Sequence, residues 1–411
     1  MDEKKKVPKL RFKGFTDDWE QRCLIEMLAQ PITDGPHETP NLVKRGIPFI
    51  SVEAVMNNRL DFTRKRGFIS SEYNDQCNKK YKPQLHDVYL VKSGSTVGKV
   101  AIVETNMVFN IWSPLAAMRV NEFNNAYFLY YLLQTDNLQD QIKKKSKGGT
   151  QPNLSMRILE KCITNSTNLK EETQIALILN KVDKLLLLQQ RKLKQLKFIK
   201  KAMVQKLFTT KNVPNLRFKG FNSNWEQRKL KEISTKCVKK NKDSLNLPVL
   251  TNSAIQGIVF QDQFFDKSIA KKINNYYLVR PDDFVYNPRI SNNAPFGPIR
   301  RNKLSNIGVM SPLYYVFSLK DKVNKDFMEY YFMSSRWHRF MYKNGDSGAR
   351  SDRFSIKDDI FKNMPIIIPT MKEQEKIGAF LKMLNHYIDL QQDKISKLQT
   401  YKRFLLQNMF I

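Results

Sequence analysis

The sequence predicts an α+β protein in which two mixed α/β domains alternate with two long helices that form an antiparallel coiled coil. Two observations lead to this fold: a segment near the start recurs about 205 residues later, and a long stretch of seven-residue periodicity closes each half. A duplication of this kind predicts pseudo-two-fold symmetry. The expected boundaries are a first domain over 1–165, a long helix over 166–210, a second domain over 211–367 and a second helix over 368–411.

The head of each half carries the repeat. Val7–Leu24 reads VPKLRFKGFTDDWEQRCL and Val213–Leu230 reads VPNLRFKGFNSNWEQRKL, so that thirteen of eighteen positions are identical. The repeated aromatic residues could stack on nucleic-acid bases, but core packing is the preferred interpretation because the same set occurs in both halves. They are Phe12, Phe15 and Trp19 in the first copy and Phe218, Phe221 and Trp225 in the second.

The globular segments, roughly 25–165 and 231–365, are predicted to alternate short strands with helices. Strands are expected where β-branched and aromatic residues cluster between Gly, Ser and Asn loops. The expected strands are Asp87–Val91, Lys99–Val103, Leu115–Val120, Asp283–Tyr286 and Tyr314–Leu319. A helical run follows in each half, at Ala126–Lys145 and Asn324–Tyr342.

The closing segments, Lys170–Phe208 and Lys372–Phe410, are predicted to be coiled-coil helices. Each follows capping-box spacing, Asn168-x-x-Glu171 and Thr370-x-x-Glu373. Apolar residues then recur with a seven-residue pattern, and the seam has two polar interruptions at equivalent places in the two copies. One interruption is the pair Gln189 and Gln391, which face each other at the centre if the register is symmetric; a solvated edge of the seam is the alternative.

Composition favours a polyanionic partner. The net charge is +31, which suits phosphate neutralisation and counterion release on nucleic acid. The four cysteines and four histidines are scattered without metal-ligand spacing, so no metal site is expected, and reduced thiols fit a cytoplasmic location. Neither a signal peptide nor an apolar run of membrane-spanning length is apparent.

Catalytic signatures are absent or broken. Tyr286-Asn287-Pro288-Arg289 has only part of the Asn-Pro-Pro-aromatic motif of amino-methylating DNA enzymes. Gly94–Lys99 has three residues between its glycines where a phosphate-binding loop has four, so it is interpreted as a hairpin loop. Asp282-Asp283 is interpreted as a turn before a strand. No catalytic residue is therefore assigned.

These features resemble the specificity (S) subunit of type I restriction–modification systems. The resemblance covers essentially the whole chain and rests on PxLRFxGFxxxWEQ at the head of each half and on the closing helices. Ile367–Lys376 is similar to the lead into the family's helix, and Ser347–Arg353 to the segment before it. The first half departs from this pattern, because Cys162–Glu172 lacks the Pro and Gly149–Asn153 replaces the Arg-bearing segment.

The resemblance implies a subunit with no catalytic activity of its own. Each domain would be a target recognition domain that reads one half of a split double-stranded DNA target, and the paired helices would set the spacing. A 39-residue helix is roughly 58 Å long, enough to hold two domains about one DNA turn apart. Two modification (methyltransferase) subunits would bind the methyl donor and flip the target adenine, restriction subunits would cleave, and this chain would hold no cofactor. A self-sufficient DNA methyltransferase or nuclease with degenerate motifs is the alternative, and a pure coiled-coil scaffold a third.

Candidate DNA-binding residues are Arg, Lys, Asn, Ser and Thr in predicted loops and helix ends, since Arg and Asn can pair bidentately with guanine and adenine. In the first domain they are Arg64, Lys65, Arg66, Lys92, Ser95, Thr96, Lys99, Lys143, Lys144, Lys145 and Lys147. In the second they are Arg289, Asn292, Asn293, Arg300, Arg301, Lys303, Arg350 and Arg353. For any single residue, an ordinary solvated side chain is an equally good interpretation.

Overall fold

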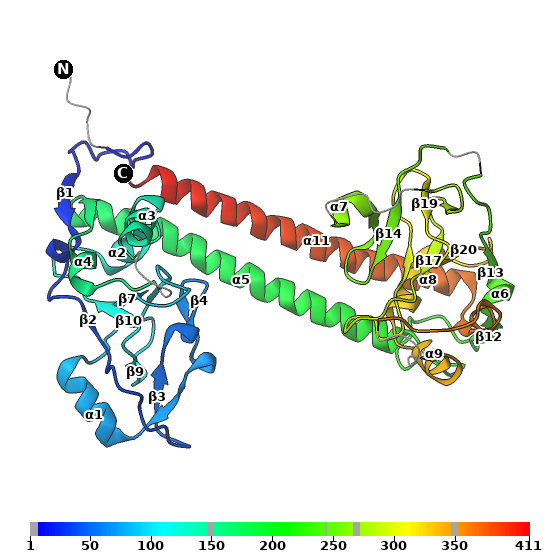
Figure 1. Cartoon of the computed structure of the whole chain (residues 1–411), viewed down its shortest axis with the longest axis horizontal. Helices are drawn as coiled ribbons and strands as arrows, with labels where there is room; N and C mark the ends of the chain where they lie inside the picture. Colours follow the sequence, from blue (N-terminus) through cyan, green and yellow to red (C-terminus); the bar gives the residue numbers. More distant parts are fainter. Residues whose placement is uncertain (1–6, 147–151, 243–244, 266–271, 347–351) are drawn as a thin grey trace. The chain divides into compact units, whose positions relative to one another are not determined.

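The computed structural model describes residues 7–146, 152–242, 245–265, 272–346 and 352–411. They form two compact units. Unit 1 is Met1–Gln190 with Asp393–Ile411, and unit 2 is Arg191–Gln392. Each unit therefore contains one globular domain together with a part of each long helix, α5 (Leu169–Leu207) and α11 (Met371–Asn408) (Figure 1).

The globular domain of unit 1 is built mainly from short strands. Its strands are β1 (Glu20–Cys23), β2 (Thr33–Asp34), β3 (Ile47–Ile50), β4 (Val55–Met56), β5 (Arg59–Leu60), β6 (Gly67–Ile69), β7 (Val88–Val91), β8 (Val100–Ile102), β9 (Asn110–Ile111), β10 (Leu115–Met118) and β11 (Ile163–Ser166). Its α-helices are α1 (Ser71–Lys80), α2 (Ala126–Leu132), α3 (Asp136–Lys145) and α4 (Met156–Glu160). Three 3-10 helices lie at Leu24–Met27, Val52–Ala54 and Phe62–Arg64.

The globular domain of unit 2 has a similar order of elements. Its strands are β12 (Glu226–Lys229), β13 (Ser234–Lys236), β14 (Leu250–Ser253), β15 (Gly257–Phe260), β16 (Tyr277–Val279), β17 (Phe284–Tyr286), β18 (Ile299–Arg301), β19 (Gly308–Met310), β20 (Tyr315–Leu319) and β21 (Pro365–Ile368). Its helices are α6 (Leu230–Ile233), α7 (Gln261–Phe265), α8 (Lys325–Met333), α9 (His338–Asn344) and α10 (Asp358–Phe361).

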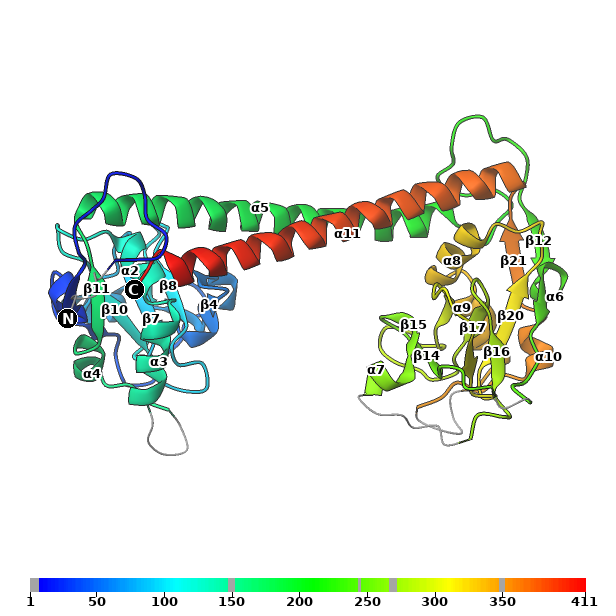
Figure 2. The ribbon, with the colours of Figure 1, turned by 90° about the horizontal axis from the view of Figure 1, so that it is seen from above.

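Each unit contains its own four-stranded sheet and its own two-stranded sheet, arranged in the same way. The four-stranded sheet is antiparallel, with order β2-β10-β7-β8 in unit 1 and β13-β20-β17-β18 in unit 2. The two-stranded sheet joins the head of each half to the strand before the long helix, pairing Glu20 with Ser166 and Glu226 with Ile368 (Figure 2). The head strands repeat in sequence (EQRC and EQRK), whereas their partners ITNS and PIII do not, so the internal repeat is a repeat of fold that extends beyond the repeated sequence. The expected strands around Val88, Val100, Leu115, Phe284 and Tyr315 are all present.

Both expected helical runs in the globular segments are broken, which corrects the sequence analysis. Ala126–Lys145 divides into α2 and α3, and Asn324–Tyr342 divides into α8 and α9. A buried hydroxyl ends the first helix each time: Thr135 Oγ1 donates to the Leu132 carbonyl at 2.7 Å, and Ser334 Oγ donates to the Tyr331 carbonyl at 2.6 Å. These hydroxyls satisfy carbonyls that the helix leaves without a partner, which favours ending it there.

The two repeated tryptophans pack at the base of each long helix, as predicted, while the repeated phenylalanines Phe12, Phe15, Phe218 and Phe221 are half-buried. Trp19 and Trp225 are each 2 % exposed. Trp19 contacts Phe128 of α2 and Phe410 beyond α11, with ring centroids 5.8 and 6.3 Å away. In unit 2, Phe327 of α8 contacts Trp225 at 6.0 Å and Phe208, just beyond α5, at 5.1 Å. The core of each unit is thus completed by the end of the long helix that belongs to the other half of the sequence.

A buried ion pair fixes the start of each long helix. Arg11 binds both carboxylate oxygens of Glu171 at 2.7 and 2.8 Å, and Arg217 binds both of Glu373 at 2.7 Å. The predicted capping box is therefore only half formed at α5: Asn168 Oδ1 accepts from the Glu171 amide, while the Glu171 side chain turns to Arg11. A guanidinium offers this carboxylate two charge-assisted bonds, whereas the capping box would offer it one.

The two long helices run antiparallel within each unit. In unit 1, Asp183 of α5 binds Lys402 of α11 at 2.8 Å, and in unit 2, Lys200 of α5 binds Asn385 of α11 at 2.6 Å. The predicted seam follows the seven-residue pattern from Ile175 to Leu207 and from Ile377 to Met409. It is confirmed, because every residue at a position of this pattern is buried or half-buried. Gln189 and Gln391 are 8 % and 7 % exposed, so they lie in the seam. They belong to different units, and their pairing stays a prediction.

Candidate DNA-recognition surfaces

In both units the loop that joins a central strand of the four-stranded sheet to its edge strand (β7 to β8 in unit 1, β17 to β18 in unit 2) meets the segment that precedes the long helix. In unit 1, the loop after β7 pairs with that segment through Ser93 and Asn153, and the Leu154 amide donates to the Lys92 carbonyl at 2.7 Å. In unit 2, the loop after β17 pairs in the same way through Arg289 and Arg353. Each unit therefore presents a composite loop surface at an equivalent place in its fold.

The unit 1 loop is a hairpin, as predicted for Gly94–Lys99, because β7 and β8 are antiparallel neighbours. Gly94 and Gly98 have φ of 89° and 92°, which favours glycine. Gln139 of α3 holds the loop by donating to the Gly98 carbonyl at 2.8 Å. Ser95 and Lys99 are exposed on this loop and Thr96 is half-buried, so the loop can present all three to a ligand. Sequence reasoning missed Gln139, because nothing in the local sequence signals this contact.

Lys92 lies at the base of the same loop, but its ammonium group already forms an ion pair within the protein. Its ammonium group is 3.1 Å from Asp34, whose carboxylate is fully buried and also binds Lys80. The Lys92 side chain is only 12 % exposed. Its charge therefore stabilises the buried Asp34 carboxylate and is not freely available to DNA.

The other unit 1 candidates fall into two groups. Arg64, Lys65 and Arg66 lie next to β6 in the sheet β6-β3-β9, where the Arg66 guanidinium stacks 3.9 Å from the Trp112 ring centroid. Lys143, Lys144 and Lys145 are exposed in the last turn of α3, where a helix C-terminus favours cations. Lys145 bonds weakly to the Lys161 carbonyl at 3.4 Å. Lys147 lies outside the described residues.

The unit 2 loop carries guanidinium groups and amides. Asn292 and Asn293 are exposed in the turn closed by Ser291 and Ala294. The Asp352 carboxylate lies 3.8 Å from Arg289 Nε and 3.9 Å from Arg353 Nε. These two arginines also line a cavity of about 430 Å³ with Asn252 and Tyr314. The loop and the segment paired with it thus bring together four predicted residues, Arg289, Asn292, Asn293 and Arg353. Asn252 and Tyr314 were not predicted, because a strand residue and a single Tyr carry no sequence signal for a cavity.

Three other unit 2 candidates have their charges satisfied internally. Arg300 donates to the Ala254 carbonyl at 2.6 Å, and burial lowers the pKa of its guanidinium. Arg301 binds Asp326 at 2.6 Å as well as Asp282, and Lys303 binds Glu329 at 2.6 Å. Arg300 thus links β18 to the turn after β14, and Arg301 links β18 to α8 and to the turn before β17. Arg350 lies outside the described residues.

The rejected catalytic motifs have structural roles. Asn287 is buried, donating to the Asn252 carbonyl and accepting from the Arg289 amide, so it supports the loop. Asp282 occupies a turn with φ of 72° immediately before β17, as predicted. Among the described residues no group of three or more His, Cys, Asp or Glu side chains could hold a metal ion. Within the same residues no helix is long and apolar enough to cross a membrane.

Comparison with known proteins identifies the class. Residues 17–198 and 222–400 match the type I restriction modification DNA specificity domain. The MjaX type I restriction enzyme specificity subunit of Methanocaldococcus jannaschii is 25 % identical over 409 residues, covering 95 % of this chain and 92 % of that protein. The MjaVIII specificity subunit of the same organism is 23 % identical, covering 83 % of this chain and 82 % of that protein.

Solved structures show the same fold at low sequence identity. The type I restriction–modification S subunit of M. genitalium has a TM-score of 0.60 and 13 % identity, covering 98 % of this chain and 99 % of that one. A chain from a structure of type I R-M assembly has a TM-score of 0.53 and 14 % identity, covering 95 % and 97 %. These two structures therefore share the fold of this chain.

The chain belongs to the family of type I restriction–modification specificity subunits. It is a DNA sequence-specificity subunit, the non-catalytic recognition component of such a system. The alternative of a self-sufficient methyltransferase or nuclease is thereby set aside.

Proposed function

We propose that this chain reads a bipartite DNA target, with unit 1 on one half-site and unit 2 on the other. The observation that supports this is one fold carrying two different loops: Ser, Thr and Lys after β7, and Arg and Asn after β17. Because different side chains at equivalent places pair with different base edges, the two units would recognise different sequences.

A double substitution in the loop of unit 2 tests this directly. Replacing Asn292 and Asn293 with Ser, in the presence of the matching modification subunits, should alter the half-site read by unit 2 and leave the other unchanged. Both side chains are exposed, so the fold should tolerate the change. Methylated positions are mapped across genomic DNA. A change in both half-sites, or in neither, counts against one domain per half-site.

The long helices would set the gap between half-sites. Inserting seven residues after both Gln189 and Gln391 keeps the seam in phase and lengthens the helices by about 10 Å, about three base pairs. The mapped gap should grow by that amount while the half-sites stay the same. An unchanged gap would refute the spacer role.

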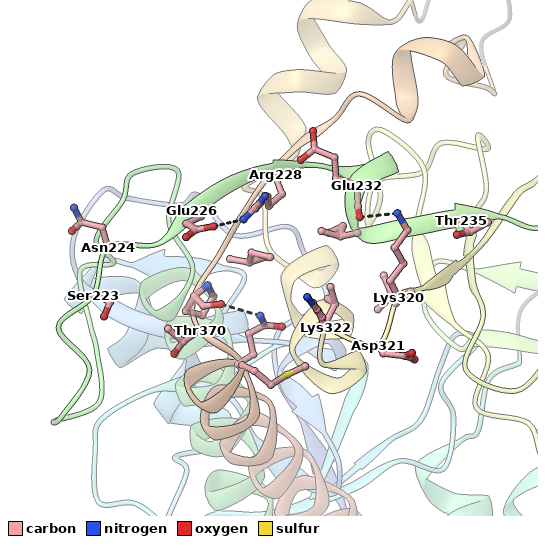
Figure 3. A pocket seen from close by; sticks show the side chains of 17 residues that line it. Ser223, Asn224, Glu226, Arg228, Glu232, Thr235, Lys320, Asp321, Lys322 and Thr370 are labelled. Carbon is pink, nitrogen blue, oxygen red and sulfur yellow. Dashed lines mark hydrogen bonds and ion pairs between the residues drawn. The ribbon is translucent and has the colours of Figure 1, made fainter.

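We also propose that two copies of one modification subunit bind the chain, and that restriction subunits join this complex. Exposed head residues support the first part, because nothing in the fold requires them to be identical in the two halves. The side chains of Glu20 and Glu226 are 68 % and 67 % exposed, and each pairs with the Arg two residues later. Glu226 and Arg228 lie on the wall of a groove of about 1310 Å³ (Figure 3). A surface kept the same on both units suits two copies of one partner.

In this assembly the methyl donor would bind to the modification subunits, and this chain would hold no cofactor. The proposed location is the cytoplasm, where the DNA is. The partner subunits supply the chemistry, and this chain determines where on the DNA it takes place.

A further inference from the structure

A cationic depression in unit 2 lies apart from the loop surface described above. It is bordered by α9, by Thr209 and Thr210 beyond α5, and by strands β12 and β21, and its volume is about 270 Å³. Arg336, Arg339 and Lys343 line it, and no carboxylate is found among the described residues of its lining. Sequence analysis singled out none of these three residues.

The geometry of α9 explains why the cations gather there. Arg339 and Lys343 are four residues apart and therefore lie on one face of the helix. Trp337 and Met341 anchor the opposite face in the core, with exposed fractions of 2 % and 0 %. Arg339 and Lys343 are exposed, and neither forms an ion pair within the described part of the chain.

Arg336 is the fixed member of the group. Its guanidinium donates to the Gln205 carbonyl, while its Nε is buried without a hydrogen-bond partner among the described residues. A buried donor of this kind costs free energy unless a ligand or water satisfies it. The depression therefore combines two exposed cations with a third whose guanidinium is held by a backbone carbonyl.

The equivalent helix in unit 1 lacks this arrangement. With Trp337 aligned on Leu138 and Met341 on Ile142, the three cationic positions correspond to Asn137, Asp140 and Lys144. Because Asp140 carries the opposite charge to Arg339, an anion would be favoured only in unit 2. The feature is specific to one unit and is not part of the repeated framework.

We infer that this depression binds a backbone phosphate of the DNA, as a sequence-independent contact that holds unit 2 on the duplex. This inference rests on the proposed function. Three cations without a carboxylate select an oxyanion, and a 270 Å³ depression is large enough for one phosphate group. The contact would strengthen binding equally for all sequences, while the loop after β17 supplies the choice of base.

The test is the salt dependence of duplex binding by the complex with its modification subunits. The variant Arg339→Gln/Lys343→Gln should bind target and non-target duplex more weakly by the same factor. Its slope of log K against log salt should be shallower by about 0.9, the value for one lost phosphate contact. The methylated sequence should not change.

The matched control is Lys239→Gln/Lys357→Gln, which removes two exposed charges of the same unit outside both the depression and the groove. It lowers the net charge equally, so its slope reports the general field alone. A slope equal in the two variants would overturn the phosphate site while leaving the proposed function intact. A wild-type complex without a steep slope would overturn the proposed function. Loss of the modification subunit from the Arg339/Lys343 variant on gel filtration would assign the depression to an acidic partner segment and also overturn the inference.

Discussion

Single side chains that hold the head of each half to its long helix should be the most sensitive residues outside the cores. Arg11 is 12 % exposed and its partner Glu171 is fully buried. Arg11→Ala should destabilise unit 1 by about 3–5 kcal/mol, because it leaves an uncompensated buried carboxylate. Thermal unfolding measures the loss.

The control for this prediction lies in the same segment. Arg22 forms a similar ion pair with Glu20, but these side chains are 35 % and 68 % exposed. Arg22→Ala should therefore cost less than about 1 kcal/mol. If the two variants melt at the same temperature, burial does not decide the worth of these pairs.

Glu172 is the residue whose charge state the fold controls most clearly. Burial raises the pKa of its carboxyl group to about 8, and one of its oxygens has no hydrogen-bond partner among the described residues. The other oxygen accepts a hydrogen bond from the backbone N–H of Asn125 at 2.7 Å. The equivalent residue in unit 2 is Gln374. Its side-chain oxygen accepts from the backbone N–H of Asn324 at 2.9 Å, and its side-chain nitrogen donates to the Pro369 carbonyl. A protonated Glu172, like that glutamine, is uncharged and can both accept and donate a hydrogen bond.

Glu172→Gln should therefore stabilise unit 1 in a pH-dependent way. Because the folded pKa lies above the value in the unfolded chain, folding becomes less favourable as pH rises from about 4.5 to 8. The variant lacks this cost, so it should be more stable by a few kcal/mol near pH 8, and the advantage should disappear near pH 4.5. Melting curves across this range provide the measurement. An advantage that does not vary with pH would show that Glu172 does not titrate as described.

At the scale of elements, the long helices contain equivalent lysines in different settings. Lys402 binds Asp183, whose side chain is 13 % exposed. Lys200 instead donates to the side-chain oxygen of Asn385 and lies over the Tyr330 ring, and burial lowers the pKa of its ammonium group. Lys402→Met should destabilise unit 1, because it strands a nearly buried carboxylate. Lys200→Met should be neutral or stabilising in unit 2, because it removes a desolvated charge with no countercharge bonded to it.

The converse substitution serves as the check on this pair. Asn385 donates to the Asp389 carboxylate at 3.3 Å, so a new carboxylate at 385 needs Asp389 neutralised. Asn385→Asp/Asp389→Asn provides Lys200 with the carboxylate that its counterpart already has, and it should raise the melting temperature of unit 2. If Lys200→Met and Lys402→Met shift the melting temperature in the same direction, the partner does not determine the effect.

The elements also show what can be predicted from sequence. The long helices could be predicted because one apolar seam repeats over 39 and 38 residues, so the pattern exceeds local irregularity. The breaks at Thr135 and Ser334 could not, because each depends on one hydroxyl bond within a continuous apolar run. Two-residue strands such as β2 and β9 exist only through tertiary pairing.

The candidate DNA-binding residues were also only partly predictable from the sequence. Positive charge in the loops identified Lys99, Arg289 and Arg353, whose side chains remain partly or wholly exposed. It also selected Lys92, Arg300 and Arg301, because a sequence does not show that a buried carboxylate or carbonyl lies opposite a cation. Distant partners decide which charges stay available, and those partners are set by the fold.

At the scale of the whole molecule, membership of a non-catalytic family predicts a simple biochemical result. The purified chain with duplex DNA and labelled methyl donor should transfer no methyl group, and adding the matching modification subunit should restore transfer. Scintillation counting of the recovered DNA provides the measurement. Transfer by the chain alone would mean that it carries an active site that its sequence does not show.

The exchange of helix ends has a consequence for how the protein is made. Phe128 and Trp19 are synthesised early, yet the ring that completes their cluster is Phe410. Unit 2, by contrast, obtains its closing ring, Phe208, before most of its own sequence exists. Unit 1 therefore lacks a core residue until position 410 has been made, whereas the part of α11 that unit 2 needs ends at Gln392.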